Sequence, residues 1–186
     1  MNRDGNVGDL LARAELIHPS QDVQLALDAM AAEVQACMGG HDPVLLAVMT
    51  GGLYPAVWLS SRLGFPHQLD YVHVTRYEGE TRGGQIRWRA KPRLNLDGRA
   101  VLIVDDILDE GLTLAEIVEY CHAEGAAEVR TAVLVEKCHD RNRGGVVPDF
   151  RGLQVPDRYV FGCGMDYREY FRNLPAIYAL PESETT

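Results

Sequence analysis

Residues Arg99–Cys121 constrain the fold of this chain more than any other stretch. The stretch begins with an unbroken apolar run, Ala100–Val104, which is typical of a strand buried on both faces of a parallel sheet. Acidic residues and a glycine follow the run directly: Asp105, Asp106, Asp109 and Gly111. The chain therefore passes from a buried strand into an acidic, glycine-bearing loop.

A helical pattern follows this loop. Apolar residues recur at i, i+3, i+4 and i+7: Leu114, Ile117, Val118 and Cys121. Thr113 and Glu116 have the spacing of a capping box, which predicts that the helix begins near Thr113. The order is strand, acidic loop, helix.

Such a loop suits a ligand that carries both a phosphate and a diol. Open α/β sheets bind ligands beyond the carboxyl ends of their strands, and a helix N-terminus offers unpaired N–H groups to an anion. Gly111 allows a phosphate to approach closely, and the Thr113 hydroxyl adds a hydrogen bond. Asp105 and Asp106 would repel a phosphate, so we expect them to accept hydrogen bonds from sugar hydroxyls or to hold Mg²⁺.

A second unit of the same kind lies upstream. The apolar run Val44–Met49 predicts another buried strand, which ends at Thr50, Gly51 and Gly52 before a helix that is expected to continue through Leu63. From the residues alone, a second anion site and a plain tight turn are equally compatible with this pattern.

The remaining pattern predicts further helices, strands and one long polar loop. Helices are expected at Asp9–Glu15 and from Ser20 to the glycine pair Gly39–Gly40. Strands are expected at Gln68–Thr75, Gln85–Lys91, Val129–Val135, Asp149–Val155 and Arg158–Phe161. The polar stretch Glu78–Gly84 lacks periodicity and is predicted to be a mobile loop, either a plain hairpin tip or a lid over a reactive site.

Composition narrows the class of protein. A chain of 186 residues with 46% apolar content suits one domain with a real core. The net charge of −9 argues against a general nucleic-acid or anionic-membrane surface, and no apolar run is long enough to span a bilayer. The cysteines are scattered without a CxxC pair, which predicts reduced thiols in a cytoplasmic protein.

The central stretch also resembles a known family. VLIVDDILDEGLT (Val101–Thr113) resembles the phosphoribosyl-pyrophosphate (PRPP) signature of type I phosphoribosyltransferases, and most of all their 6-oxopurine branch, the hypoxanthine-guanine phosphoribosyltransferases. Other blocks that resemble this family occur in order along the chain: MGGHDPVLLAVMTGG, VTRYEG, VLVEKC and PDRYVFGCGMDYREYFRNL. The resemblance covers nearly the whole chain, from about Ile17 to Ile177, and several ordered blocks are more specific than one motif.

The resemblance implies a fold and a reaction. The implied fold is α/β, a doubly wound, mostly parallel sheet with a small hood subdomain. Residues 1–186 would form a single phosphoribosyltransferase domain, with a core at about 40–145 and a hood from about 1–38 and 146–180. The implied reaction transfers 5-phosphoribosyl from PRPP to hypoxanthine and/or guanine, giving IMP or GMP and pyrophosphate. Mg²⁺ would be the cofactor, and the assembly a homodimer or homotetramer.

The family's functional residues map onto this chain by position. Asp109 matches the catalytic residue that accepts, or hydrogen-bonds, the N7 proton of the purine. The segment matching the ribose-phosphate site comprises Asp105, Asp106, Asp109, Glu110, Gly111, Leu112 and Thr113. The pyrophosphate site matches Thr50, Gly51, Gly52 and Arg172. The purine site matches Lys137, which reads O6, and Tyr159, Val160 and Asp166. The metal ligands would be Asp166, Asp105 and Asp106, and the lid would begin at Arg76 and Tyr77.

Two positions depart from the family pattern. Thr50 stands where the purine-salvage pattern usually has lysine, and Arg76 stands where it has serine. Two other classes also fit part of the sequence: a non-catalytic regulator that keeps the PRPP fold, and a receiver-like domain with paired aspartates. Within the enzymes, xanthine- or pyrimidine-specific transfer is the main rival.

Overall fold

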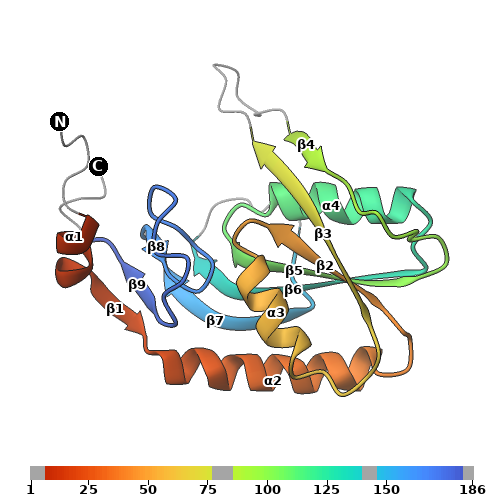
Figure 1. The fold of residues 1–186 in the computed structure, drawn as a ribbon, viewed down its shortest axis with the longest axis horizontal. Helices are drawn as coiled ribbons and strands as arrows, with labels where there is room; N and C mark the ends of the chain where they lie inside the picture. The colour runs from red at the N-terminus through yellow and green to blue at the C-terminus, as the bar shows by residue number, and fades with distance from the viewer. Residues whose placement is uncertain (1–6, 77–85, 140–145, 182–186) are drawn as a thin grey trace.

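The computed structural model describes residues 7–76, 86–139 and 146–181. It contains a six-stranded sheet with strand order β4-β3-β2-β5-β6-β7 and a three-stranded sheet with order β1-β9-β8 (Figure 1). The strands of the large sheet are β2 (Val44–Met49), β3 (Gln68–Arg76), β4 (Ile86–Ala90), β5 (Ala100–Leu108), β6 (Glu128–Cys138) and β7 (Phe150–Pro156). All neighbours in this sheet are parallel except the edge strand β4, which pairs antiparallel with β3.

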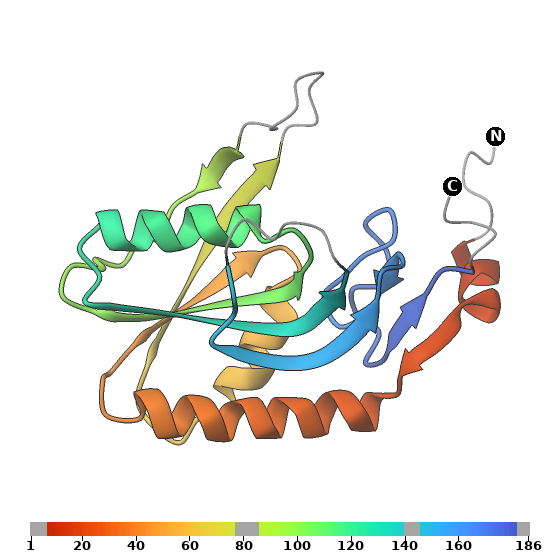
Figure 2. The same cartoon turned by 180° about the vertical axis from the view of Figure 1, so that it is seen from behind.

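Helices cover both faces of the large sheet because its strands are apolar on both sides. Leu45 and Ala47 of β2 pack in one core cluster with residues of α2 (Ser20–Met38) and α3 (Leu53–Ser60). The alternate β2 residues, Val44, Leu46 and Val48, pack in a second cluster with α4 (Leu112–Ala123). Figure 2 shows α4 on the face opposite to α2 and α3. The predicted doubly wound, mostly parallel α/β fold is confirmed.

The small sheet joins the two ends of the chain. Its strands are β1 (Glu15–His18), β8 (Val160–Phe161) and β9 (Ile177–Ala179), and α1 (Val7–Arg13) lies beside them (Figure 1). The strand β9 pairs antiparallel with both β1 and β8. Leu10, Phe161 and Leu180 form a separate small core here. Both segments that are predicted to form the hood contribute strands to this sheet, and we refer to the sheet with its connecting loops as the hood.

Several predicted boundaries differ from the structure. Glu15 begins β1 rather than ending the first helix, and its partner is Ala179 at the far end of the chain, which no local pattern reveals. The strand β7 pairs in parallel with β6, and α2 packs on the large sheet, so both belong to the core rather than to the hood. The helix α3 ends at Ser60, before Leu63.

Within the described residues, the structure contains no helix with the length and hydrophobicity that crossing a membrane requires. The four cysteines, Cys37, Cys121, Cys138 and Cys163, are free thiols.

Candidate active site

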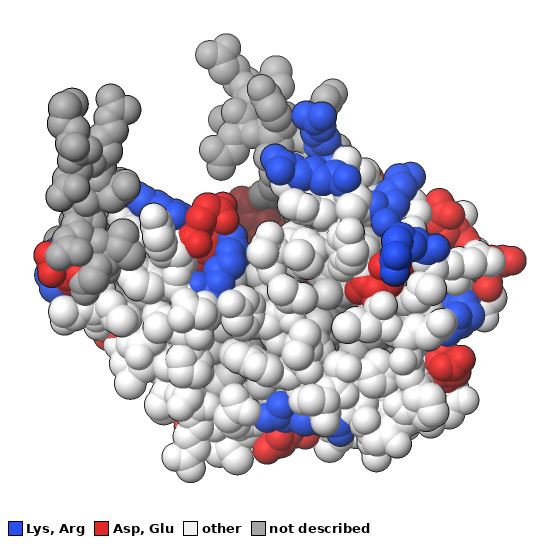
Figure 3. Space-filling model, viewed as in Figure 1, with Lys and Arg blue, Asp and Glu red and all other residues white. Residues whose placement is uncertain are grey.

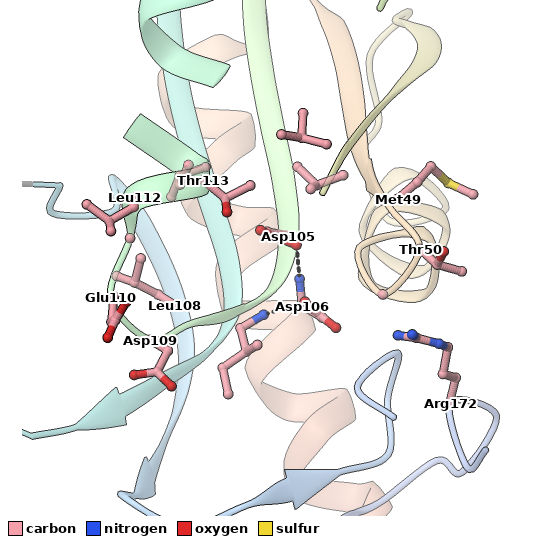
Figure 4. A pocket seen from close by; sticks show the side chains of 16 residues that line it. Met49, Thr50, Asp105, Asp106, Leu108, Asp109, Glu110, Leu112, Thr113 and Arg172 are labelled. Atoms are coloured by element: carbon pink, nitrogen blue, oxygen red, sulfur yellow. Dashed lines mark hydrogen bonds between the residues drawn. The ribbon is translucent and has the colours of Figure 1, made fainter. Parts of the chain in front are cut away.

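A cavity of about 270 Å³ lies beyond the carboxyl ends of β2 and β5. These strands are neighbours at the point where the strand order reverses, with β3 on one side and β6 on the other. Open α/β sheets bind ligands at such a switch point. Both predicted loops line the cavity, the one after β2 and the one after β5 (Figure 4).

The strand β5 extends beyond the apolar run that predicts it. Its pairing with β6 continues through Asp105 to Leu108, which lies opposite Glu136. Asp105 and Asp106 are therefore strand residues rather than loop residues. Backbone pairing does not depend on side-chain polarity, so the end of an apolar run does not mark the end of a strand.

Asp105 and Asp106 form a tightly packed acidic pair on the cavity wall. The N–H of Asp106 donates to Oδ1 of Asp105, and the N–H of Ile107 donates to Oδ1 of Asp106, each at 2.9 Å. Desolvation raises the pKa of Asp105 well above its ordinary value, and the charge of Asp106 adds to the rise. Desolvation also raises the pKa of Asp106, against the opposing effects of its hydrogen bonds and of the Arg172 charge. Ligands that bring hydroxyl donors or a cation would stabilise this pair.

The N-terminus of α4 is capped by glycine rather than by a side chain. Gly111 is the N-cap, with φ of 73°, and no described side chain makes a capping hydrogen bond. The helix begins at Leu112, which agrees with the predicted start near Thr113, but Thr113 lies inside the first helical turn and does not cap the helix. Thr113 lines the cavity together with Glu110, Gly111 and Leu112. The N–H groups of a first helical turn lack intrahelical partners, so this end suits a phosphate.

The turn after β2 packs directly against the acidic pair. The Met49–Thr50 peptide bond is cis, and Thr50 and Gly51 line the cavity. A Cβ atom on Gly51 would lie 1.7 Å from Oδ2 of Asp106, and one on Gly164 would lie 2.2 Å from the Gly51 carbonyl oxygen. Glycine at both positions leaves room for the Asp106 carboxylate where these three chain segments meet.

Of the other two predicted pyrophosphate residues, Arg172 lines the cavity and Gly52 does not. The N–H of Gly52 donates to the Val48 carbonyl at 2.9 Å, and Gly52 is absent from the cavity lining. Arg172 does line the cavity, and Figure 4 shows its side chain directed towards Asp106 and the Thr50 turn. Its guanidinium donates to the Gly164 carbonyl at 2.8 Å and pairs with Asp166 at 2.6 Å. The hood therefore presents Arg172 to the cavity.

A second cavity of about 190 Å³ adjoins the first and shares Asp106, Ile107 and Asp109 with it. The rest of its lining comes from the end of β6 and from the hood: Lys137, Tyr159, Val160, Met165 and Asp166. All the predicted purine-binding residues therefore meet in one place. Tyr159 is 42% exposed, so its ring has an open surface on which a flat ligand can stack.

Asp109 lies at the junction of the two cavities and contacts Lys137. Leu108, the last residue of β5, lies opposite Glu136 of β6, so the residues that follow them, Asp109 and Lys137, also come close. Nζ of Lys137 donates to Oδ2 of Asp109 at 2.9 Å. This ion pair joins the predicted catalytic residue to the predicted reader of O6.

Sequence reasoning misses several residues of the site, among them His139, Ile107 and Met165. His139 contacts Asp109, and Ile107 and Met165 line the second cavity. The signal for His139 is its position two residues after Lys137 at a strand end, because alternate strand residues share a face. Met165 has no local signal, because its position depends on the hood. Arg76 ends β3, while Tyr77 and the rest of the predicted lid lie outside the described residues.

Known proteins resemble this chain in both sequence and fold. Residues 14–168 match the phosphoribosyl transferase domain family. The hypoxanthine-guanine-xanthine phosphoribosyltransferase of Tritrichomonas foetus is 30% identical over 171 residues, covering 92% of this chain and 93% of the relative. The human hypoxanthine-guanine phosphoribosyltransferase is 31% identical over 166 residues, covering 84% of this chain and 76% of the relative.

A solved structure of a hypoxanthine-guanine-xanthine phosphoribosyltransferase matches this fold with a TM-score of 0.82 at 27% identity, covering 90% of this chain and 97% of the other. The family match spans every strand of the large sheet and both units that line the first cavity. The chain belongs to the phosphoribosyltransferase family and, within it, to the hypoxanthine-guanine phosphoribosyltransferases.

Proposed function

We propose that this protein transfers 5-phosphoribosyl from PRPP to hypoxanthine or guanine, giving IMP or GMP and pyrophosphate in purine salvage. The observation that carries the proposal is the pair of adjoining cavities with Asp109 at their junction. The first offers a helix N-terminus and carboxylates, which suit a ribose phosphate. The second cavity is large enough for a flat ring and contains a lysine, which suits a 6-oxopurine. The new bond would form where the two cavities meet.

In this proposal each group of PRPP has its own partner. The 5′-phosphate binds the segment Asp109–Thr113, where the first N–H groups of α4 and the Thr113 hydroxyl lie. The ribose hydroxyls donate to Asp105 and Asp106. The pyrophosphate lies near Thr50, Gly51 and Arg172.

The purine would bind in the second cavity in one orientation. The Lys137 ammonium donates to O6, the Tyr159 ring stacks on the base, and the Val160 backbone faces the base edge. Asp109 accepts the N7 proton as the bond between ribose and N9 forms. The bond from ribose to pyrophosphate breaks through an oxocarbenium-like transition state, which the nearby carboxylates stabilise electrostatically.

The donor set of the first cavity fits Mg²⁺, which we propose as the cofactor. Among the described residues, no group of three or more His, Cys, Asp or Glu side chains is arranged to hold a metal. Mg²⁺ is commonly bound by one or two carboxylates together with substrate phosphates, and Asp105 and Asp106 supply such carboxylates. Asp166 is paired with Arg172, which suits a contact through water. When bound, the metal neutralises the leaving pyrophosphate.

We also propose a homodimer or homotetramer located in the cytoplasm. The helix α3 exposes Leu53 and Val57, which with Tyr54 and Trp58 line an apolar hollow of about 250 Å³. Figure 3 shows few charged side chains over this face. The free cysteines support a reducing compartment. Light scattering of the protein and of Val57→Asp tests the assembly, since a charge in a buried interface should dissociate it.

A panel of free bases with PRPP and Mg²⁺, followed by pyrophosphate release, tests the proposed reaction. Hypoxanthine and guanine should release pyrophosphate, while adenine and uracil should not. Xanthine belongs in the panel because one relative is named for it. Release with uracil alone would overturn the proposal in favour of pyrimidine transfer. Saturable PRPP binding without turnover of any base would instead identify a non-catalytic regulator.

A further inference from the structure

We propose that His139 is a positioning residue for Asp109: it holds one carboxylate oxygen so that the other faces the purine during the reaction. The inference rests on the proposed function, in which Asp109 accepts the N7 proton. It assigns a role to a residue that belongs to neither the ribose-phosphate site nor the purine site.

The two oxygens of Asp109 have different partners. Oδ1 lies 2.9 Å from Nε2 of His139, and Oδ2 lies 2.9 Å from Nζ of Lys137. An ionised carboxylate only accepts hydrogen bonds, so the imidazole tautomer that makes this contact carries its hydrogen on Nε2. The carboxylate is therefore oriented from two sides in the ligand-free protein.

Purine binding changes one of these sides. The proposed contact of Lys137 with O6 draws its ammonium towards the base, and the N7 proton needs an Asp109 oxygen as its acceptor. Oδ2, on the Lys137 side, is the oxygen that can exchange one partner for the other. His139 keeps its bond to Oδ1 throughout this exchange, so the carboxylate does not rotate when Lys137 moves.

The burial of His139 suits this task. Its side chain is 3% exposed, against 38% for Asp109. Water cannot readily replace a buried N–H donor, and a packed ring has few alternative rotamers. His139 directly follows β6, whose backbone is held by β5 and β7 on either side. The imidazole ring is therefore attached to a rigidly held backbone.

Substitution of His139 separates this role from a purely structural one. His139→Phe keeps a ring but removes the hydrogen-bond donor. It should lower kcat by about tenfold, because a misplaced Asp109 carboxylate contributes less to the rate as a general base. The KM for PRPP should stay within about twofold, because His139 is not among the residues that line the first cavity. His139→Gln restores an N–H donor and should recover part of kcat. This split between kcat and KM, with rescue by the conservative variant, is not expected from a general loss of packing.

His67→Phe is the matched control. His67 is a partly buried histidine with two hydrogen bonds, to Ser60 at 2.7 Å and to the Phe65 carbonyl at 3.0 Å, and neither of these partners lines a cavity of the site. Its kcat should equal that of the unmodified protein. If His139→Phe does not unfold cooperatively and is therefore not properly folded, His139→Asn takes its place. The asparagine side chain is too short for its amide to reach Asp109.

A double-mutant cycle with Asp109→Asn completes the test. If His139 acts through Asp109, adding His139→Phe to Asp109→Asn should lower kcat no further. The proposal is overturned if His139→Phe leaves kcat within twofold, or if the two losses multiply. Unchanged kcat in Asp109→Asn alone would instead overturn the proposed role of Asp109, and the inference with it.

Discussion

Two units of the same design line the first cavity, and they offer a ligand different chemistry. Each consists of a parallel strand, a glycine turn and a helix: β2 with α3, and β5 with α4. After β2, the first N–H groups of the helix are already bonded: Leu53 N–H to the Thr50 carbonyl and Tyr54 N–H to the Gly51 carbonyl, both at 3.3 Å. The N-terminus of α3 is therefore closed to a ligand, because these N–H groups already have backbone acceptors.

The unit after β5 differs because its turn passes through a left-handed glycine, Gly111, directly before the helix. Ala115 N–H bonds to the Gly111 carbonyl at 2.9 Å, which is the ordinary first bond of a helix. The N–H groups before it lie in the first turn, where helices lack internal acceptors. The comparison teaches that a strand–glycine–helix pattern predicts a phosphate site only when the turn leaves those N–H groups available.

The largest expected effect lies in the unit after β5. Asp109→Asn keeps the shape of the loop and the open helix end, but removes the proton acceptor at the junction of the cavities. General acid–base assistance is worth roughly 10²–10⁴ in rate, so kcat should fall by that factor. PRPP affinity, measured by calorimetry, should stay nearly constant. Unchanged kcat would remove Asp109 from the chemistry, while lost PRPP binding would show that it supports the loop.

The next effect concerns the lysine that Asp109 holds. Lys137→Ala removes the proposed donor to O6, and hydrogen bonds to charged groups contribute about 1.5–3 kcal/mol. The kcat/KM for hypoxanthine and guanine should therefore fall roughly ten- to hundredfold, and discrimination against adenine should weaken. Competition kinetics with adenine measure both quantities. Adenine rejection as strong as before would mean that Lys137 does not read O6.

A smaller effect is expected where the two units touch. Gly51→Ala would place Cβ 1.7 Å from Oδ2 of Asp106, so the carboxylate must turn away. Overpacking typically costs about 1–3 kcal/mol, and the free energy of unfolding should fall accordingly. Pyrophosphate and PRPP affinities should weaken by about tenfold as the acidic pair moves. Urea unfolding and calorimetry give the two numbers.

Gly40→Ala is the control for this substitution, because a Cβ atom there would meet nothing within 4 Å. It should change neither stability nor affinity. Equal behaviour of the two variants would show that Asp106 moves freely and that the close packing at Gly51 is unimportant.

The large sheet is predictable from the sequence because its signals are local. Continuous apolar runs such as Val44–Met49 and Ala100–Val104 identify strands buried on both faces, and their glycine turns locate the edge where ligands bind. The family signature adds the order of site residues along the chain. These features do not depend on contacts between distant segments.

The hood and the end of β5 are less predictable for the opposite reason. The strand β1 exists because Glu15 and Leu16 pair with Ala179 and Tyr178, which lie far away in sequence. The pairing of Asp105–Leu108 depends on β6 rather than on side-chain polarity. The contact of His139 with Asp109 likewise requires the register of two strands, although its spacing from Lys137 gives a hint.

The smallest expected effect tests whether the closed unit after β2 contributes through its side chain at all. Thr50 lines the cavity but offers only a neutral hydroxyl, and the cation nearest to this turn in the lining is Arg172. Hydrogen bonds to charged groups are worth about 1 kcal/mol more than neutral ones, so Thr50→Lys should tighten pyrophosphate binding by about fivefold. If product release is limiting, turnover of Thr50→Lys should then slow, which pre-steady-state kinetics measure.

Thr50→Val keeps the shape of the side chain and deletes the hydroxyl. If the Gly51 backbone and Arg172 do most of the binding, the dissociation constant of pyrophosphate should rise by no more than about fivefold, because a neutral hydrogen bond contributes about 1 kcal/mol. Calorimetry of the three proteins at fixed Mg²⁺ decides between these contributions. Abolished binding in Thr50→Val would assign the hydroxyl a larger role. An unchanged constant in Thr50→Lys would mean that this turn does not face the pyrophosphate, and that the two units serve different ligands.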